Sequence, residues 1–122
     1  MSWNAANTAC QDMVPGFEGE LATVSDGDPT AYFLEHLNLF LSKLITTPGN
    51  SFIGAYKNAG TWTWSNMDPW GYHNWNSPSE PSGHASETII MMSPNGKWND
   101  ASPNTPYATS FICQYSRTRL KI

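Results

Sequence analysis

The residues whose chemistry is easiest to recognise lie between Trp75 and Asp100 in this chain of 122 residues. The polar positions of this stretch carry carboxylate, amide and hydroxyl oxygens, which come from Glu80, Ser82, Glu87, Asn99 and Asp100. Hard cations such as calcium bind roughly six to eight oxygens, which flexible loops can supply. The stretch therefore predicts a calcium site.

Several short motifs occur in a fixed order along the chain. They are Phe52-Ile53-Gly54-Ala55, Thr63-Trp64-Ser65, Glu80-Pro81-Ser82 and Trp98-Asn99-Asp100. Together they resemble the C-type lectin-like domain family, which has Trp-Ile-Gly-Leu at the first motif and Glu-Pro-Asn at the third. The resemblance extends from Trp3 to Tyr115. It implies an α+β, C-type lectin-like fold with two helices, two small antiparallel sheets and a long calcium- and sugar-binding loop.

The same resemblance implies calcium-dependent carbohydrate binding without catalysis. The implied calcium ligands are Glu80, Ser82, Glu87, Asn99 and Asp100. Two neighbouring sugar hydroxyls would contact the ion and the side chains of Glu80, Ser82, Glu87 and Asn99, with His84 as an additional sugar contact. Glu80 at the head of its motif implies a preference for mannose-type sugars, and the Glu80–Pro81 bond is expected to be cis.

Ser82 departs from the family pattern, which has Asn at this position. An Asn side chain offers a carbonyl oxygen and an amide donor, whereas the hydroxyl of Ser82 is shorter and offers one donor. We therefore expect weaker calcium binding than in the Asn form. Many proteins of this fold bind no calcium and use the same surface for protein partners. A calcium-independent, protein-binding module is thus the alternative function.

Two catalytic or metal alternatives are less favoured. Glu80 and Glu87 near Trp75 could form a glycosidase pair, since such enzymes use two carboxylates and aromatic sugar platforms. A general acid needs a raised pKa, however, and carboxylates clustered with Asn and Asp on loops are more typical of ion ligands. The three histidines do not show a zinc-ligand spacing such as His-x3-His; they are His36, His73 and His84.

The composition excludes other classes of protein. Only 13% of the residues are charged, and the chain has six Trp, nine Pro and nine Gly, which predicts one loop-rich domain of an extracellular type. The formal net charge of −4 argues against a nucleic-acid or anionic-membrane surface. No run of about 20 apolar residues could cross a membrane. We expect a single domain at residues 1–116 and a basic tail at 117–122.

The beginning of the chain carries no recognisable export signal. Because the resemblance implies a secreted or extracellular protein, we expect a fragment that is N-terminally truncated relative to the family. The family begins with a strand that pairs with the last strand. We therefore expect the strand Thr109 to Tyr115 to have a bare edge, which is a template for self-association.

Two helices are predicted before a run of strands, which is an α+β order. Ser2 can cap the first helix, whose inward face includes Met13, and Pro15-Gly16 ends it. Asp28-Pro29 begins the second, in which Phe33, Leu37, Phe40 and Leu44 face inward with Leu34 and Leu41 beside them. Thr47 to Asn50 closes it. Gly19 to Val24 is predicted to be an extended link.

The later strands are predicted at residues 51–56, 61–65, 89–92, 97–101 and 109–115. The turn-rich loop from Asn66 to Gly83 should be ordered around Trp70, Tyr72 and Trp75. The two cysteines, Cys10 and Cys113, are either free thiols or the disulfide that the resemblance implies. A disulfide that closes a loop of about 100 residues could contribute about 4 to 5 kcal/mol to stability.

Overall fold

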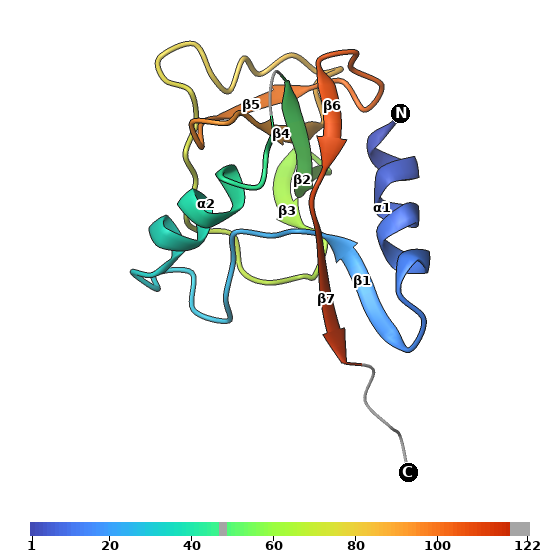
Figure 1. Cartoon of the computed structure of the whole chain (residues 1–122). Coiled ribbons are helices and arrows are strands. Elements are labelled where there is room, and N and C mark those ends of the chain that lie inside the picture. Colours follow the sequence, from blue (N-terminus) through green and yellow to red (C-terminus); the bar gives the residue numbers. More distant parts are fainter. Residues whose placement is uncertain (47–48, 118–122) are drawn as a thin grey trace.

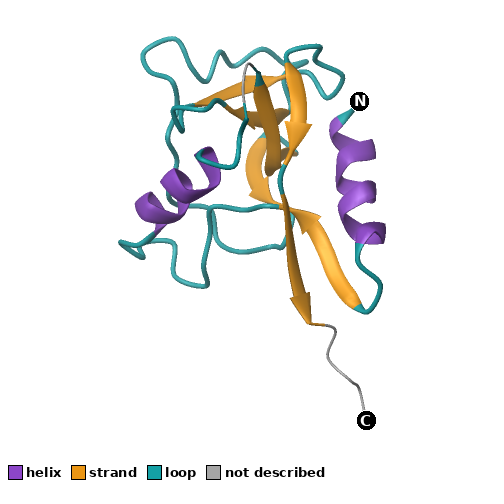
Figure 2. Cartoon of the chain, viewed as in Figure 1, coloured by secondary structure: helices purple, strands orange, loops and turns teal. Residues whose placement is uncertain are grey.

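The computed structural model describes residues 1–46 and 49–117. Two helices lie on opposite sides of the strands (Figures 1 and 2), so the predicted α+β class is confirmed. The elements are α1 (Trp3–Met13), β1 (Phe17–Leu21), α2 (Leu34–Ser42), β2 (Asn50–Asn58), β3 (Thr61–Trp64), β4 (Ile89–Met92), β5 (Trp98–Ala101), β6 (Ala108–Phe111) and β7 (Cys113–Arg117).

The described strands form two sheets. The larger sheet has the order β3-β2-β4-β5, and β6 pairs with β2 in parallel while the other neighbours are antiparallel. The smaller sheet is an antiparallel pair of β1 and β7, which extends away from the larger sheet in Figure 1. The buried strand β4 therefore lies between β2 and β5, and it fixes the place of Asn99 and Asp100 opposite Met91 and Ile90.

The predictions for the two sheet-forming segments near the ends need correction. The segment taken as an extended link, Gly19 to Val24, overlaps β1, which pairs with β7 from Phe17↔Arg117 to Leu21↔Cys113. The last strand is therefore not bare on the edge that β1 covers. The predicted strand from Thr109 to Tyr115 also divides at Ile112, whose carbonyl accepts a hydrogen bond from the Ala22 amide at 2.8 Å. Residue 117, assigned to the tail, ends β7, and residues 118–122 lie outside the described part.

Helix α1 begins as predicted. The hydroxyl of Ser2 accepts a hydrogen bond from the Ala5 amide at 3.1 Å, which satisfies one free donor of the first turn. Trp3, Ala6 and Cys10 are buried, and Cys10 forms a disulfide with Cys113 of β7. Met13, however, is exposed. The helix is thus attached to the sheets by its first two turns and by the disulfide.

Helix α2 is rotated relative to the prediction: Leu34 and Leu41, which were placed beside the inward face, are at its centre, and Leu37 is partly buried. Its buried residues are Leu34, Asn38, Leu41 and Ser42, whereas the side chains of Phe33, Phe40 and Leu44 are 42%, 59% and 50% exposed. The sequence analysis assigned Asn38 no role. In the fold, the Asn38 amide donates to the Gly96 carbonyl at 3.0 Å and accepts from the Trp98 indole at 2.8 Å, so its burial leaves no polar atom unpaired.

The start of α2 also differs from the prediction. Asp28 does not cap the helix; its carboxylate accepts hydrogen bonds from the amide and hydroxyl of Thr30 at 2.9 and 2.7 Å, which forms a turn before the helix. The helix itself begins at Leu34. Two residues of the predicted closing turn, Thr47 and Pro48, lie outside the described residues.

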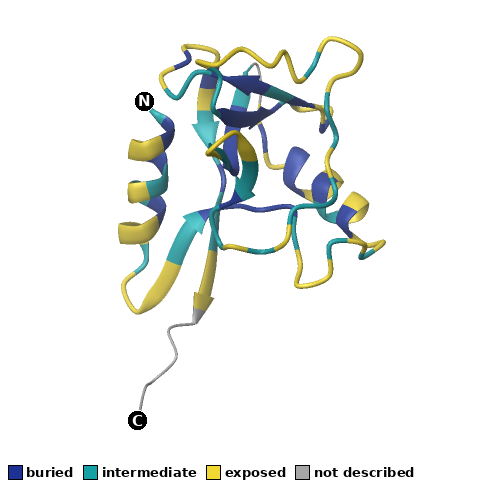
Figure 3. Ribbon diagram, turned by 180° about the vertical axis from the view of Figure 1, so that it is seen from behind, coloured by how far each residue is buried: buried dark blue, intermediate teal, exposed yellow. Residues whose placement is uncertain are grey.

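The buried side chains form two clusters, and successive residues of β2 and β4 belong to different clusters, which places one on each face of the larger sheet. Figure 3 shows the buried residues along these strands in dark blue. One cluster contains the α1 residues and the other contains Leu34 and Leu41 of α2 with the indoles of Trp64 and Trp98. The long loop between β3 and β4 packs onto this second cluster through Trp70, Tyr72 and Trp75. That loop carries most of the predicted site.

Candidate functional site

Trp98 is the residue on which the loop is built. Its ring, fully buried at the start of β5, lies 6.2 Å from the ring of Trp70, 6.0 Å from Tyr72 and 5.9 Å from Trp75, all in edge-to-face orientation. Such aromatic pairs stabilise beyond the area they bury. The backbone is joined as well, because the Asn76 amide donates to the Trp98 carbonyl at 2.9 Å. The loop is therefore ordered around its aromatic residues.

A second set of contacts fixes the turn before β5. The side-chain amides of Asn38 and Asn74 both donate to the Gly96 carbonyl, at 3.0 and 2.7 Å. The Trp98 amide donates to the Asn74 carbonyl at 2.9 Å. Helix α2, the loop and the turn thus hold one another, and β5 leaves this junction with Asn99 and Asp100 as its next two residues.

Asp100 is the centre of the acidic group. Its side chain is 2% exposed, and its carboxylate accepts hydrogen bonds from the amides of Ser82 and Gly83 at 2.8 and 3.1 Å. The Ser82 hydroxyl also donates to it at 3.3 Å. Burial alone would raise the pKa of Asp100, but hydrogen bonds from Glu80, Ser82 and Gly83 outweigh burial and lower it. Asp100 is therefore the more acidic partner of the pair it forms with Glu80.

Glu80 lies against Asp100 at a cis Glu80–Pro81 bond, the isomer that the family resemblance implies. Its carboxylate accepts a hydrogen bond from the Ser82 amide at 3.2 Å. Burial, together with the hydrogen bond and the charge of Asp100, raises the pKa of Glu80 to about 7. Two like charges in contact disfavour the doubly ionised form, and the proton is retained by Glu80.

Ser82 joins the third carboxylate to this pair. Its hydroxyl donates to Glu87 Oε1, and the Glu87 amide donates to the His84 carbonyl at 3.0 Å. Ser82 therefore offers its amide and hydroxyl to three carboxylates, which are those of Glu80, Glu87 and Asp100. In this structure the amide and hydroxyl of Ser82 act as hydrogen-bond donors.

Asn99 contributes an oxygen that has no protein partner. The side chain is half-buried, and its Oδ1 atom is buried without a hydrogen bond from any described residue. A buried carbonyl oxygen without a partner is costly, and such atoms are rare in folded proteins. A cation or a donor from a ligand would satisfy it.

The acidic residues line one open depression of about 430 Å³, here called the carboxylate depression. Its lining residues are Glu80, Glu87, Met91, Asn99, Asp100, Ala101, Ser102, Asn104, Thr105, Pro106 and Tyr107. The sequence analysis missed the segment from Ser102 to Tyr107, which forms one wall. Its only signal was its run of polar and turn-forming residues between two strands.

Two predicted roles are not supported by direct contacts in the depression. His84 is exposed and does not line it. Within the described residues, no three His, Cys, Asp or Glu side chains lie in an arrangement that could hold a metal by themselves. An ion here would depend on Asn99, on backbone or ligand oxygens and on displacement of the Ser82 donors. The donor set is rich in the oxygen ligands that calcium prefers, so it fits calcium in chemical type.

The described residues contain no helix long and apolar enough to cross a membrane.

Comparison of the sequence with those of known proteins finds similar C-type lectin-like proteins. The mouse (Mus musculus) low affinity immunoglobulin epsilon Fc receptor is 30% identical over 119 residues, which are 95% of this chain and 31% of the receptor. A C-type lectin mannose-binding isoform from Oxyuranus scutellatus is 30% identical over 118 residues, which are 93% of this chain and 70% of that protein. The chain thus spans less than a third of the mouse receptor.

Solved structures with the same fold include proteins of different ligand requirements. One is the cow C-type carbohydrate-recognition domain of CD23, whose structure was determined in the presence of a GlcNAc2Man3 oligosaccharide. It has a TM-score of 0.72 at 22% identity, and the aligned region covers 98% of this chain and 83% of the CD23 chain. Another is a calcium-independent type II antifreeze protein, which has a TM-score of 0.69 at 21% identity. The aligned region covers 96% of this chain and 79% of the antifreeze protein chain. At these identities the likeness concerns the fold alone.

The family assignment rests on agreement between sequence and fold. The motifs that resemble the family occupy β2, β3, the loop and β5, and these elements form the sheet and the depression. The family model described as "Lectin C-type domain" matches residues 1–115. This chain belongs to the C-type lectin domain family.

Proposed function

We propose that the carboxylate depression binds a calcium ion and, beside it, neighbouring hydroxyls of a mannose-type glycan. The observation that carries this proposal is the buried Asn99 Oδ1 atom, which lacks a partner and lines the same depression as Glu80, Glu87 and Asp100. A divalent cation would satisfy this oxygen and relieve the repulsion between the Glu80 and Asp100 carboxylates. Calcium would supply a fixed positive charge to which sugar hydroxyls can bind.

The protein groups would divide the remaining work. Carboxylates accept hydrogen bonds from sugar hydroxyls, and the amide nitrogen of Asn99 can donate to a sugar oxygen. Glu80, Glu87 and Asn99 line the depression and are the side chains best placed for this. The relatives support the substrate class, since one is named as a mannose-binding isoform.

Ser82 is expected to weaken the ion site. Its amide and hydroxyl donate to three carboxylates, and these donors compete with a cation for the same oxygens. We therefore place the dissociation constant for calcium near the weak end of extracellular sites, at about 1 mM.

The alternative is a calcium-independent module that binds a protein partner. The observation in its favour is the same Ser82 contact set, together with the Gly83 amide, which stabilises the carboxylates with protein hydrogen bonds alone. Proteins of this fold include a calcium-independent member. In this alternative, the depression would be a structural feature beside the true contact surface.

An enzyme is the less favoured class. The pKa of Glu80 is raised to about 7, as a general acid requires, but the causes are burial and the contact with Asp100. Glycosidase carboxylates stand about 5 to 9 Å apart, on either side of the scissile bond. Glu80 and Asp100 are in contact, which leaves no room for that bond between them, and Glu87, the other member of the pair considered from the sequence, accepts a hydrogen bond from the Ser82 hydroxyl. We propose a binding protein that acts outside the cell, where the Cys10–Cys113 disulfide would persist.

Thermal unfolding with calcium and with chelator tests the proposal. With a dissociation constant of about 1 mM, about 10 mM calcium should stabilise the protein by about 1.4 kcal/mol. Glu87→Gln should reduce this stabilisation, whereas Glu18→Gln, which removes an exposed charge on β1, should leave it unchanged. Ser82→Asn should increase it, because a side-chain carbonyl oxygen takes the place of the hydroxyl that donates to Glu87 and Asp100.

A glycan array then separates the two functions. Calcium-dependent binding to mannose-rich glycans that is weakened in Glu87→Gln supports the proposal. Glycan binding that persists in chelator, or a wild-type protein whose unfolding does not respond to calcium, would favour the calcium-independent alternative.

A further inference from the structure

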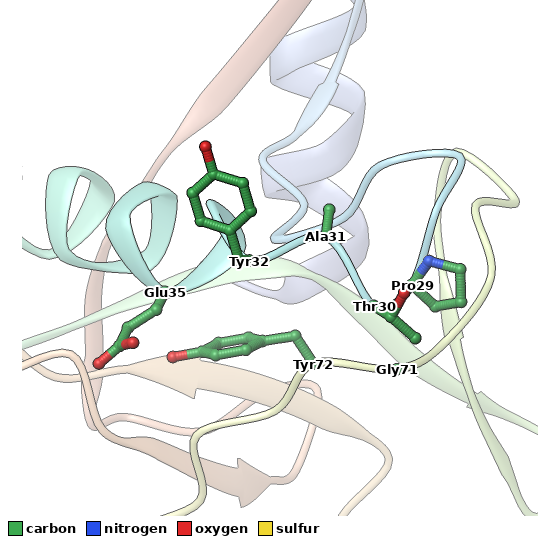
Figure 4. A pocket seen from close by; sticks show the side chains of 7 residues that line it. All are labelled: Pro29, Thr30, Ala31, Tyr32, Glu35, Gly71 and Tyr72. Carbon is green, nitrogen blue, oxygen red and sulfur yellow. The ribbon is translucent and has the colours of Figure 1, made fainter.

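A second hollow lies between the turn that precedes α2 and the long loop. It is an open cleft of about 570 Å³, here called the tyrosine cleft, lined by Pro29, Thr30, Ala31, Tyr32, Glu35, Gly71 and Tyr72. None of these residues lines the carboxylate depression. In Figure 4 the Tyr72 hydroxyl points toward the Glu35 carboxylate, and the Tyr32 ring extends from the facing segment with its hydroxyl directed away from Tyr72. The volume is in the range of small-ligand sites.

The walls of the tyrosine cleft are held from both sides. On one wall, the Asp28 carboxylate fixes the turn through Thr30. On the other, the ring of Tyr72 packs edge-to-face against the buried Trp98 at 6.0 Å. The walls meet at Gly71, where an added Cβ would lie 2.6 Å from the Pro29 carbonyl oxygen. Only a residue without a side chain allows this approach, so the cleft is a defined feature of the fold.

The side chains that line the tyrosine cleft combine aromatic rings with one negative charge. The tyrosine rings offer two aromatic surfaces, and Tyr32 is 87% exposed. Glu35 supplies a carboxylate close enough to Tyr72 that, after burial, its charge is the second cause of the raised pKa of that tyrosine. The seven lining residues include no Lys, Arg, His, Asn or Gln, so their side chains provide no N–H donor.

We propose that the tyrosine cleft binds an organic cation, an ammonium or guanidinium group that contacts the tyrosine rings and faces Glu35. Aromatic rings attract cations through their negative faces, and a carboxylate adds a complementary charge. An anion would be repelled by Glu35. A neutral sugar could use the tyrosine hydroxyls as donors, but it would leave the Glu35 carboxylate without a compensating charge. A cation brings its own donors and matches the acidic chain, whose formal net charge is −4.

The same cationic chemistry can come from a basic side chain of another protein or from a free quaternary amine. Nuclear magnetic resonance titration of the isotope-labelled chain, in chelator, distinguishes them. The probes are N-acetyl-arginine amide, with the neutral N-acetyl-citrulline amide as its matched control, and choline, with the neutral 3,3-dimethylbutanol as its control. Chelator separates this test from the calcium proposal.

We expect amide shifts at Tyr32, Glu35, Gly71 and Tyr72 with at least one cation and not with its neutral control. Glu35→Gln should weaken this binding about fivefold, as expected from the loss of one exposed charge pair. Glu18→Gln removes an equal charge elsewhere and should leave the affinity unchanged. A response to the arginine derivative alone identifies a basic side chain as the ligand, and a response to choline alone identifies a free amine.

Three results would overturn the inference. They are equal shifts with a cation and its neutral control, the same loss of affinity in Glu35→Gln and Glu18→Gln, and no shift at the cleft with either cation. Shifts at the cleft caused by methyl mannoside would instead assign it to a neutral sugar and also contradict the proposal.

Discussion

At the scale of single residues, the acidic group is a set of carboxylates held together by two neighbouring backbone amides and one hydroxyl. Asp100 accepts from Ser82 and Gly83, and the same serine reaches Glu87. Glu80 cannot share this stabilisation fully, because its closest charged neighbour is Asp100 itself. The pKa values of the two carboxylates are therefore shifted in opposite directions, that of Glu80 upward and that of Asp100 downward.

The raised pKa of Glu80 predicts a specific pH dependence of stability. In the unfolded chain Glu80 releases its proton near its ordinary pKa of 4.5, whereas in the folded chain it does so near 7. Between these values the folded state binds more protons, so stability from this group is present below pH 4.5 and lost as pH rises through 7. In chelator, the melting temperature of the wild type relative to Glu80→Gln should fall between pH 4.5 and 8.

Glu18→Gln serves as the control for loss of one carboxylate. A difference between wild type and Glu80→Gln that stays constant or increases with pH would show that Glu80 ionises normally. The comparison uses the difference between two proteins because the histidines and other carboxylates titrate in the same range.

At the scale of elements, α2 shows how a polar residue can set the orientation of a helix. Two stripes of apolar residues compete along it, one with Phe33 and Phe40 and the other with Leu34 and Leu41. The second is buried because Asn38 lies in it and pairs with Trp98 and Gly96 across the core. The first stripe is left exposed on the side away from the sheet.

Neighbouring substitutions in α2 should therefore have very different costs. Leu41→Ala removes a side chain that is 6% exposed and should lower the free energy of unfolding by about 2 to 5 kcal/mol. Phe40→Ala removes one that is 59% exposed and should change it by less than about 1 kcal/mol. Urea denaturation measures both. Equal losses would mean that the helix faces the core as the sequence pattern alone predicted.

At the scale of the whole molecule, two connections bring the chain together. The disulfide between Cys10 and Cys113 joins residues 103 positions apart and attaches α1 to the strand pair. The indole of Trp98, on β5, contacts both α2 and the long loop and so joins these three elements in the other half of the core. The candidate sites both lie on the loop side, and each includes residues supported by Trp98.

Removal of the disulfide should be among the most destabilising changes. The double variant Cys10→Ala/Cys113→Ala frees a loop of about 100 residues in the unfolded chain, for which the chain-entropy model gives a loss of about 4.7 kcal/mol. Since domains of this kind are stable by only about 5 to 15 kcal/mol, the variant should be marginally folded. Urea denaturation of the variant and of wild type with and without reductant measures the loss. Unchanged midpoints would exclude a stabilising role.

The sequence by itself determined the family, the α+β class, most strand positions, the ordered loop and the membership of Glu80, Glu87, Asn99 and Asp100 in one region. These features depend on local patterns and on motifs whose order is visible along the chain.

Only the tertiary structure decided the pairing of β1 with β7, the buried face of α2, the donor role of Ser82 and the tyrosine cleft. Each depends on a partner distant in sequence. Asn38 is buried because Trp98 satisfies it, Glu80 keeps its proton because Asp100 is beside it, and the cleft exists because Gly71 contacts Pro29. The sequence pattern identifies each of these residues, but it does not show which distant residue contacts it and so determines whether its burial or its ionisation is favourable.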